Sequence, residues 1–151
     1  MSDEIRCAYR ENTARRSTPV GRVVLLYEQL IQDVVQAIAA VKNQQVELRT
    51  NAIDHALLVL AILQGSLDLD QGGDVARNLD RFYTLVRNRL LDAQMQASDR
   101  ILEEQRALLL SLRAAWLEVE KAEGQSSDPA HAPEQRVPER KDPDSRNNWR
   151  A

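Results

Sequence analysis

The sequence predicts an all-α protein: an antiparallel four-helix bundle with an N-terminal arm and a disordered C-terminal tail. Three observations lead to this fold class. Apolar residues recur at helical spacing along most of the chain, and no stretch shows the two-residue alternation of a strand. Only one of the five prolines, Pro19, lies in the first 123 residues. The polar connections between the periodic segments are short, which favours antiparallel neighbours.

The chain begins with a polar segment, residues 1–17. This segment carries no helical period, although Ile5 and Tyr9 are one helical turn apart, so we predict an arm rather than a helix. Thr18 and Pro19 then have the pattern of a helix start, because a hydroxyl N-cap is followed by proline at the first helical position.

Four helices follow from the apolar periodicity, and they cover residues 18–42, 46–69, 74–96 and 98–122. The second is expected to end near Gly72 and Gly73, because glycine readily adopts the left-handed conformation that follows many helices. Ser98 is the expected N-cap of the fourth helix. Four long helices with short connections are most simply arranged as an antiparallel bundle, with a largely aliphatic core because aromatic residues are few.

The composition changes at Gly124. Residues 124–151 hold four of the five prolines and almost no apolar side chains apart from Val137 and Trp149. Such a segment cannot bury enough apolar surface to offset the entropy lost on ordering, so disorder is predicted. The chain therefore divides into one helical domain, residues 1–123 including the arm, and a tail to which the sequence assigns no role.

Composition excludes several classes of protein. Twenty basic and twenty-three acidic residues give a net charge of −3, which leaves no excess of positive charge for nucleic acid or a membrane surface. No apolar run approaches the ~18 residues of a transmembrane helix, so membrane insertion is not expected. The N-terminus has no apolar signal core, which predicts a cytoplasmic protein. Cys7 is the only cysteine, so no disulfide can form within the chain.

The sequence shows no arrangement of residues that is typical of a catalytic or metal-binding site. The two histidines are His55 and His131, and His55 is interpreted as a polar residue at the surface or rim of the bundle. A di-iron bundle needs glutamate three residues before an inward histidine, but Ala52 stands there. Residues 68–79 begin like a calcium loop and lack the acids expected at its fifth and twelfth positions. We predict neither an enzyme nor a bound cofactor or metal.

The second helix carries more apolar surface than a bundle needs. Residues 57–63 are an unbroken apolar run, and Leu58 and Ile62 lie outside the stripe that would face the core. The third helix adds Leu85. These side chains suggest a groove for an amphipathic helical segment of another chain. Irregular packing and a seam between two copies of the chain are the alternatives.

The connection after the second helix carries an ordered motif over residues 66–83. Together with flanking matches, it resembles flagellar secretion chaperones of the FliS type over residues 5–122. The residues that carry the resemblance are Ser66, Leu67, Asp68, Gly72, Gly73, Asn78, Leu79, Phe82 and Tyr83, with Tyr9, Thr18-Pro19, Leu25 to Glu28 and Arg113 to Trp116 on either side.

The resemblance implies a cytoplasmic four-helix bundle that binds the disordered C-terminal segment of flagellin and prevents premature polymerisation. It also implies delivery of that cargo to a component of the flagellar export gate, without a nucleotide. Family similarity further suggests that the N-terminal arm lies over the binding surface when cargo is absent, with Tyr9 as the matching residue and Ile5 as its companion. It favours the groove interpretation of Leu58 and Ile62. A structural or adaptor bundle that acts through weak homodimerisation is the alternative function.

Roles within the motif are expected to be largely structural. Gly72 and Gly73 would let the chain reverse between two long helices. Asp68 is expected to accept a hydrogen bond from the turn, since a carboxylate near a helix C-terminus is unfavourable for the helix dipole. Asn78 would tie the same turn to the third helix. Departures from the family pattern, among them Val20-Gly21 after Pro19, indicate a divergent member.

Overall fold

The computed structural model describes residues 2–126, and every regular element in that range is an α-helix. The side chains of Ser2, Tyr9, Glu11, Asn12 and Ser126 are not described. The helices are α1 (Ser2–Arg16), α2 (Pro19–Lys42), α3 (Val46–Gly65), α4 (Gly73–Gln96) and α5 (Asp99–Ser126). The predicted all-α class is confirmed. The last helix runs through Gly124, so it is longer than predicted, and the rest of the predicted tail lies outside the described residues.

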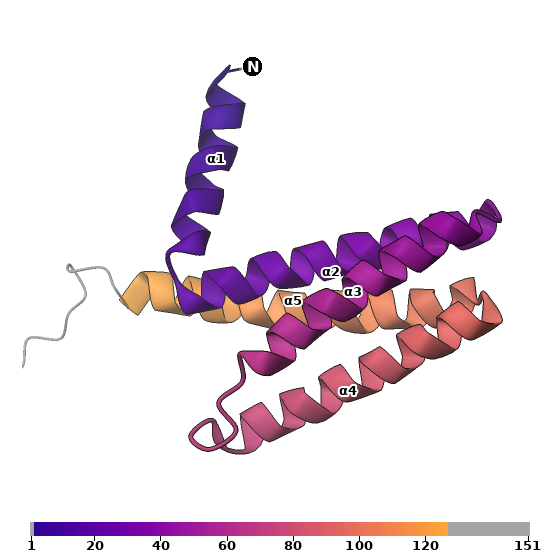
Figure 1. Ribbon diagram of the computed structural model, residues 1–151. Coiled ribbons are helices and arrows are strands. Elements are labelled where there is room, and N and C mark those ends of the chain that lie inside the picture. The colour runs from indigo at the N-terminus through magenta and orange to yellow at the C-terminus, as the bar shows by residue number, and fades with distance from the viewer. Residues whose placement is uncertain (1, 127–151) are drawn as a thin grey trace, which may run out of the picture.

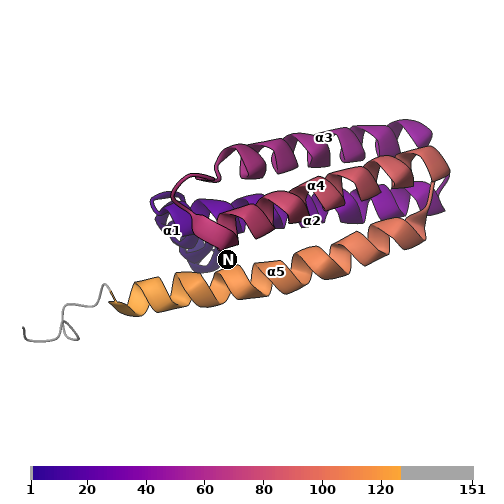
Figure 2. The same cartoon turned by 90° about the horizontal axis from the view of Figure 1, so that it is seen from below.

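Helices α2 to α5 form the predicted bundle (Figures 1 and 2). Helix α2 packs against α3 and α5, and α4 packs against the same two neighbours, so the four helices form a closed ring. Each helix runs opposite to the next one in the chain (Figure 1). This is the arrangement that short connections favour.

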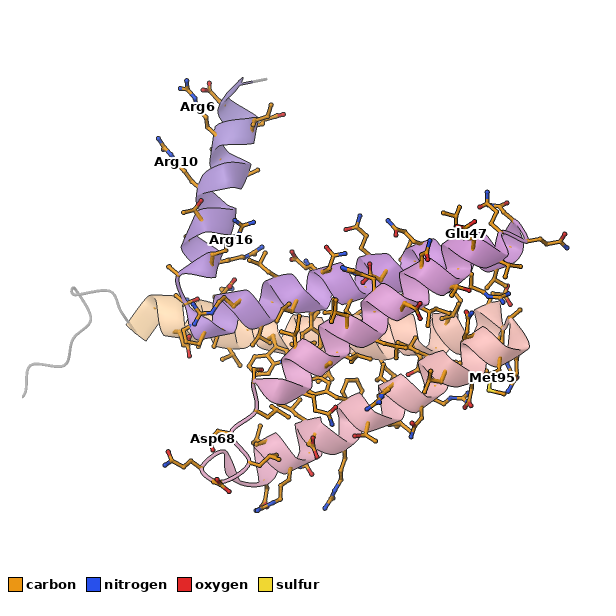
Figure 3. The ribbon with its side chains drawn as sticks, viewed as in Figure 1. Arg6, Arg10, Arg16, Glu47, Asp68 and Met95 are labelled. Atoms are coloured by element: carbon orange, nitrogen blue, oxygen red, sulfur yellow. The ribbon has the colours of Figure 1, made fainter. Side chains whose placement is uncertain are left out.

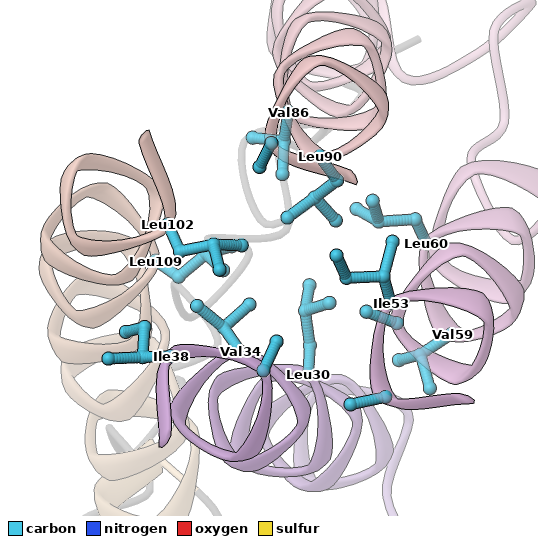
Figure 4. Packing of buried hydrophobic residues seen from close by; sticks show 14 of the residues in the cluster. Leu30, Val34, Ile38, Ile53, Val59, Leu60, Val86, Leu90, Leu102 and Leu109 are labelled. Atoms are coloured by element: carbon cyan, nitrogen blue, oxygen red, sulfur yellow. The ribbon is translucent and has the colours of Figure 1, made fainter. Parts of the chain in front are cut away.

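The core is mostly aliphatic and draws on all four bundle helices. Figure 4 shows these side chains converging on the centre of the bundle. Two tyrosines, Tyr27 and Tyr83, are also fully buried, and their hydroxyl oxygens are 2.8 Å apart in a hydrogen bond. Large fully buried aliphatic residues include Leu30 and Val34 of α2, Ile53 and Leu60 of α3, Val86 and Leu90 of α4, and Leu102 and Leu109 of α5.

The N-terminal segment is a helix, and the prediction of a non-helical arm was wrong. Helix α1 has no apolar stripe, which is why the apolar pattern did not reveal it. Its charges suit a helix, because Asp3 and Glu4 lie in the first turn and Arg15 and Arg16 in the last. The helix projects from the start of α2, away from α4 (Figure 1). It therefore does not lie over the bundle, as the family resemblance suggested for this segment.

The corner between α1 and α2 is tightly packed. Thr18 is the N-cap of α2, and its hydroxyl oxygen accepts a hydrogen bond from the backbone N–H of Gly21 at 3.0 Å, so the predicted helix start is confirmed. A Cβ atom on Gly21 would lie 2.1 Å from the carbonyl oxygen of Arg15. Arg15 also pairs with Glu120 of α5, with its Nε 3.3 Å from the carboxylate oxygen. These contacts hold the base of α1 against the bundle.

Helix α3 ends at Gly65, four residues earlier than predicted. Ser66 follows it, and the serine hydroxyl donates a hydrogen bond to the carbonyl oxygen of Leu63 at 2.7 Å, which competes with continuation of the helix. The glycine pair begins the next helix instead of ending this one. Gly72 is the N-cap of α4, and Gly73 has the positive φ of +61° that favours glycine.

Among the described helices, α2 has the length and mean hydropathy, 1.3, that a membrane-spanning helix needs. Nine of its residues are buried against α3 and α5 or at the α1 corner. An apolar helix that packs against several neighbours can have the same composition as a short membrane span, so the hydropathy of α2 fits its packing against α3, α5 and the base of α1.

Candidate partner-binding surface

The apolar residues predicted to bind a partner lie on the surface of the described structure. Leu58, Ile62 and Leu85 are 57%, 50% and 54% exposed. Ile5 is exposed on α1, and the side chain of Tyr9 lies outside what the structure describes. Since the core is filled without any of these side chains, their exposure is a feature of the surface and not a packing defect.

These residues belong to two surfaces rather than one. Leu58 and Ile62 share a helical stripe with His55, which contacts Asp33 of α2, so they lie toward the α2 side of α3. On the opposite side of α3, Gln64 bonds α4 through the Thr84 hydroxyl at 3.0 Å. The structure therefore does not bring the two α3 residues together with Leu85.

A mainly apolar groove lies between α4 and α5, one helical turn from Leu85. The two helices are close together near the turn that joins them and diverge toward the start of α4 and the end of α5 (Figures 1 and 2). The hollow has a volume of about 580 Å³ and its lining is mainly apolar. It is lined by Val75, Asn78, Leu79 and Phe82 of α4 and by Leu108, Ser111, Leu112 and Ala115 of α5. Leu85 stands one turn beyond Phe82 on the same face of α4. We call these eight residues the α4–α5 groove.

The sequence pattern does not reveal this groove, because Val75, Leu108 and Leu112 recur at the same helical spacing as the core residues of α4 and α5. Val75 and Leu108 are exposed, and Leu112 is half-buried. The missed signal is an adjacent pair of large apolar residues on each helix, Phe82-Tyr83 and Leu108-Leu109. Neighbouring positions of a helix differ by about 100°, so only one of each pair can face the core directly. Tyr83 and Leu109 take the core, and Phe82 and Leu108 face the groove.

The floor of the groove is supported by an aromatic cluster. The rings of Phe82 and Tyr83 have centroids 5.9 Å apart, and Tyr27 lies 6.3 Å from Tyr83 and 6.4 Å from Trp116. Burial raises the pKa of the Tyr83 hydroxyl far above its ordinary value, and burial also raises the pKa of Tyr27. Both hydroxyls therefore stay protonated well above the ordinary tyrosine range, and Phe82 connects the cluster to the lining of the groove.

The turn before α4 is fixed by the motif residues. The Asp68 carboxylate accepts hydrogen bonds from the backbone N–H groups of Asp70 at 3.2 Å and Gln71 at 3.0 Å, which confirms its expected role (Figure 3). Gly72 passes close to the same segment, since a Cβ atom there would lie 2.5 Å from the Asp68 carbonyl oxygen. Within the described part of the chain, Asn78 makes no hydrogen bond to this turn and lines the α4–α5 groove instead.

A second hollow, between α2 and α3, contains a cluster of hydrogen-bonded polar side chains. His55 Nδ1 lies 2.6 Å from an oxygen of the buried Asp33 carboxylate, whose other oxygen accepts a hydrogen bond from Gln29 at 3.0 Å. The histidine ring is half exposed, at the rim where it was predicted. These bonds satisfy a buried carboxylate. Residues 2–126 contain no group of three or more His, Cys, Asp or Glu side chains placed to hold a metal ion.

Comparison with known proteins tests the family resemblance that the sequence motif indicates. The family model of the flagellar protein FliS matches residues 1–123. The chain is 30% identical over 100 residues to the flagellar secretion chaperone FliSB of Pseudomonas aeruginosa, which covers 66% of this chain and 79% of that protein. It is 28% identical over 112 residues to flagellar secretion chaperone FliS of Campylobacter jejuni (74% and 88% covered), and 26% over 110 residues to that of Salmonella typhimurium (72% and 82%).

Proposed function

The chain belongs to the FliS family of flagellar secretion chaperones, and on this basis we propose that it binds the disordered C-terminal segment of flagellin in the cytoplasm. The family is one of export chaperones and not of enzymes. Bound flagellin would be kept from premature polymerisation and delivered to the flagellar secretion apparatus. The observation that carries this proposal is apolar surface outside a completed core: the α4–α5 groove with Leu85, and the exposed pair Leu58 and Ile62 on α3.

The mechanism that these surfaces support is coupled folding and binding. An unfolded segment with apolar residues at helical spacing would form turns along the α4–α5 groove and continue over the outer face of α3. Interfaces of this kind bury on the order of 1,000–3,000 Å², and ordering the segment costs ~2–5 kcal/mol of the interaction energy. The binding would be tight enough to shelter the cargo and weak enough to release it. No nucleotide is required, because the bundle itself does no chemistry.

Titration calorimetry with the flagellin C-terminal peptide from the same organism tests the proposal. We expect saturable binding at micromolar concentrations. Leu108→Asp places a charge in the groove and should weaken binding at least tenfold, since an unpaired charge in an apolar interface is strongly unfavourable. Leu110→Asp is the matched control, because Leu110 is on the same helix, is 38% exposed against 44% for Leu108, and lies outside the groove.

Leu58→Asp and Ile62→Asp test the α3 face in the same way. Both should weaken the peptide complex while the circular dichroism of the free protein stays unchanged. If the wild-type chain shows no saturable heat with the peptide, the flagellin proposal is wrong. Sedimentation at several concentrations, with and without peptide, addresses the homodimer alternative. A dimer that Leu58→Asp disrupts and that persists with peptide bound would assign that face to self-association.

A further inference from the structure

The α4–α5 groove opens toward the end of the bundle at which α5 finishes. At this end, the last residues that line the groove are Val75, near the start of α4, and Ala115, three turns before the end of α5. Figure 2 shows the start of α4 and the last turns of α5 at the same end of the bundle. The chain therefore leaves the described structure at Ser126, at the same end of the bundle and about 16 Å along the α5 axis beyond the groove residue Ala115.

Residues 127–151 contain side chains that suit this groove. In that segment the large apolar residues are Val137 and Trp149. A tryptophan side chain buries roughly 150–250 Å² and makes favourable edge-to-face contacts with other rings, and Phe82 offers such a ring in the groove. The family model ends at residue 123, so this segment lies outside the part of the chain that is shared with the family.

The length of the segment allows the contact. Trp149 follows Ser126 by 23 residues, which can span roughly 75 Å when extended. Ala115 lies 11 residues back along α5 and Leu108 lies 18 back, distances of roughly 16 and 27 Å along the helix axis. Even a compact coil of 23 residues covers roughly 25 Å, so Trp149 can reach any point along the groove.

The charges are complementary as well. Trp149 is flanked by Arg146 and Arg150, and the seven residues 145–151 contain no Asp or Glu. At the open end of the groove, exposed carboxylates stand beside the lining: Glu118 follows Ala115 by one helical turn, and Asp74, which pairs with Arg77 at 2.8 Å, directly precedes Val75. Opposite charges around an apolar contact favour binding of the basic segment around Trp149 at this end of the groove, and an acidic segment would be repelled there.

We propose that the segment around Trp149 occupies the α4–α5 groove of its own chain when no cargo is bound. The proposal rests on the proposed function, since it treats the groove as the cargo surface and the tail as an internal competitor. Tethering supplies an effective concentration on the order of millimolar, so a weak contact suffices for substantial occupancy. Cargo that binds many sites along the bundle would displace the single tryptophan anchor.

Acrylamide quenching of tryptophan emission tests the docking in the full-length protein. The signal of Trp149 is obtained by subtracting the Trp149→Ala variant, in which Trp116 remains. We expect Trp149 to be shielded in the wild-type chain, and the shielding to be lost with Leu108→Asp and kept with Leu110→Asp. A Trp149 that is quenched as readily as a free tryptophan derivative overturns the docking. Shielding that disappears on dilution also overturns it, because a second copy would then be the source of the tryptophan.

Binding of the flagellin C-terminal peptide tests the competition. If the tail occupies half to nine-tenths of the grooves, Trp149→Ala should raise peptide affinity about two- to tenfold, in proportion to the groove that it frees. Trp149→Phe keeps a ring and should give a smaller increase. Unchanged affinity in a chain whose Trp149 is shielded overturns the competition. Failure of every variant to bind the peptide would contradict the proposed function, and the quenching result would still decide whether the tail docks.

Discussion

Helices α2 and α4 have the same length and lie opposite each other in the ring, between the same two neighbours, yet they bury very different shares of their residues. Both are 24 residues long; nine residues of α2 are buried and five of α4. Helix α2 is covered by α3, by α5 and at its start by the base of α1. Helix α4 touches the same two bundle helices and leaves Val75, Phe82 and Leu85 partly or largely exposed.

The comparison teaches that helical periodicity identifies an apolar face without saying what covers it. The apolar residues of α2 meet other helices of the chain. Those of α4 divide between the core, through Tyr83, Val86 and Leu90, and the groove that it forms with α5. A bundle helix with an apolar face wider than its neighbours can cover is free to offer the remainder to another chain.

The largest expected effect contrasts one leucine of each helix. Leu30→Ala removes a fully buried side chain from α2 and should lower the free energy of unfolding by about 2–5 kcal/mol, because a cavity is left in the core. Leu85→Ala removes a side chain that is mostly in water and should change it by less than ~0.5 kcal/mol. Urea denaturation measures both. Equal costs would show that α4 is packed like α2 and that the contrast is wrong.

The tyrosine pair is the point at which α4 is anchored as deeply as α2. Tyr83→Phe deprives the buried Tyr27 hydroxyl of its Tyr83 partner and should cost about 1–3 kcal/mol. The double variant Tyr27→Phe/Tyr83→Phe removes both hydroxyls and should recover part of the loss. A thermodynamic cycle of the two single variants and the double variant measures the coupling. Additive costs would show that the hydrogen bond contributes nothing to anchoring α4.

The same pair predicts a loss of stability at alkaline pH. Burial raises the pKa of both tyrosines in the folded protein, while an unfolded tyrosine ionises near pH 10. Above pH 10 the unfolded state therefore binds fewer protons than the folded state, and the free energy of unfolding falls as the pH rises. The slope approaches ~1.4 kcal/mol per pH unit for each tyrosine. Denaturation measured between roughly pH 8 and 11, a range that brackets the unfolded pKa, checks this. The free energy of unfolding should decline less in the double variant than in the wild-type chain.

The sequence was sufficient to predict the parts of the fold that depend on periodicity and capping. The four bundle helices, the Thr18-Pro19 start of α2 and the role of Asp68 in the turn are all confirmed. The helical state of residues 2–16 was missed, because a polar helix leaves no apolar pattern. The end of α3 was placed at the glycine pair because the propensity of Gly65 and the competing hydroxyl of Ser66 were given too little weight.

The candidate site was only partly predictable for a different reason. Leu58, Ile62 and Leu85 exceed the apolar stripe of their helices, so their exposure could be inferred from spacing alone. The groove residues Val75 and Leu108 lie within the stripes, and their exposure depends on how closely α4 approaches α5. That separation is set by the packing of the whole ring, which no single helix encodes.

The smallest expected effect tests the start of α2, where α1 adds the contact that α4 lacks. Gly21→Ala places a methyl group 2.1 Å from the carbonyl oxygen of Arg15, so the base of α1 must move. Alanine is also the better helix former by about 1 kcal/mol. We expect the free energy of unfolding to change by less than ~1 kcal/mol, because the two effects oppose each other, while amide hydrogen exchange across α1 accelerates.

Gly65→Ala is the matched control for this variant. Gly65 is also a helical glycine, at the end of α3, and a Cβ atom there would meet no other atom within 4 Å. The substitution should stabilise the protein by about 0.4–1 kcal/mol through the unfolded state and leave exchange in α1 unchanged. If Gly21→Ala behaves in the same way, the close approach to Arg15 does not hold α1. The start of α2 would then not be covered by α1, and the larger number of buried residues in α2 than in α4 would come from its contacts with α3 and α5 alone.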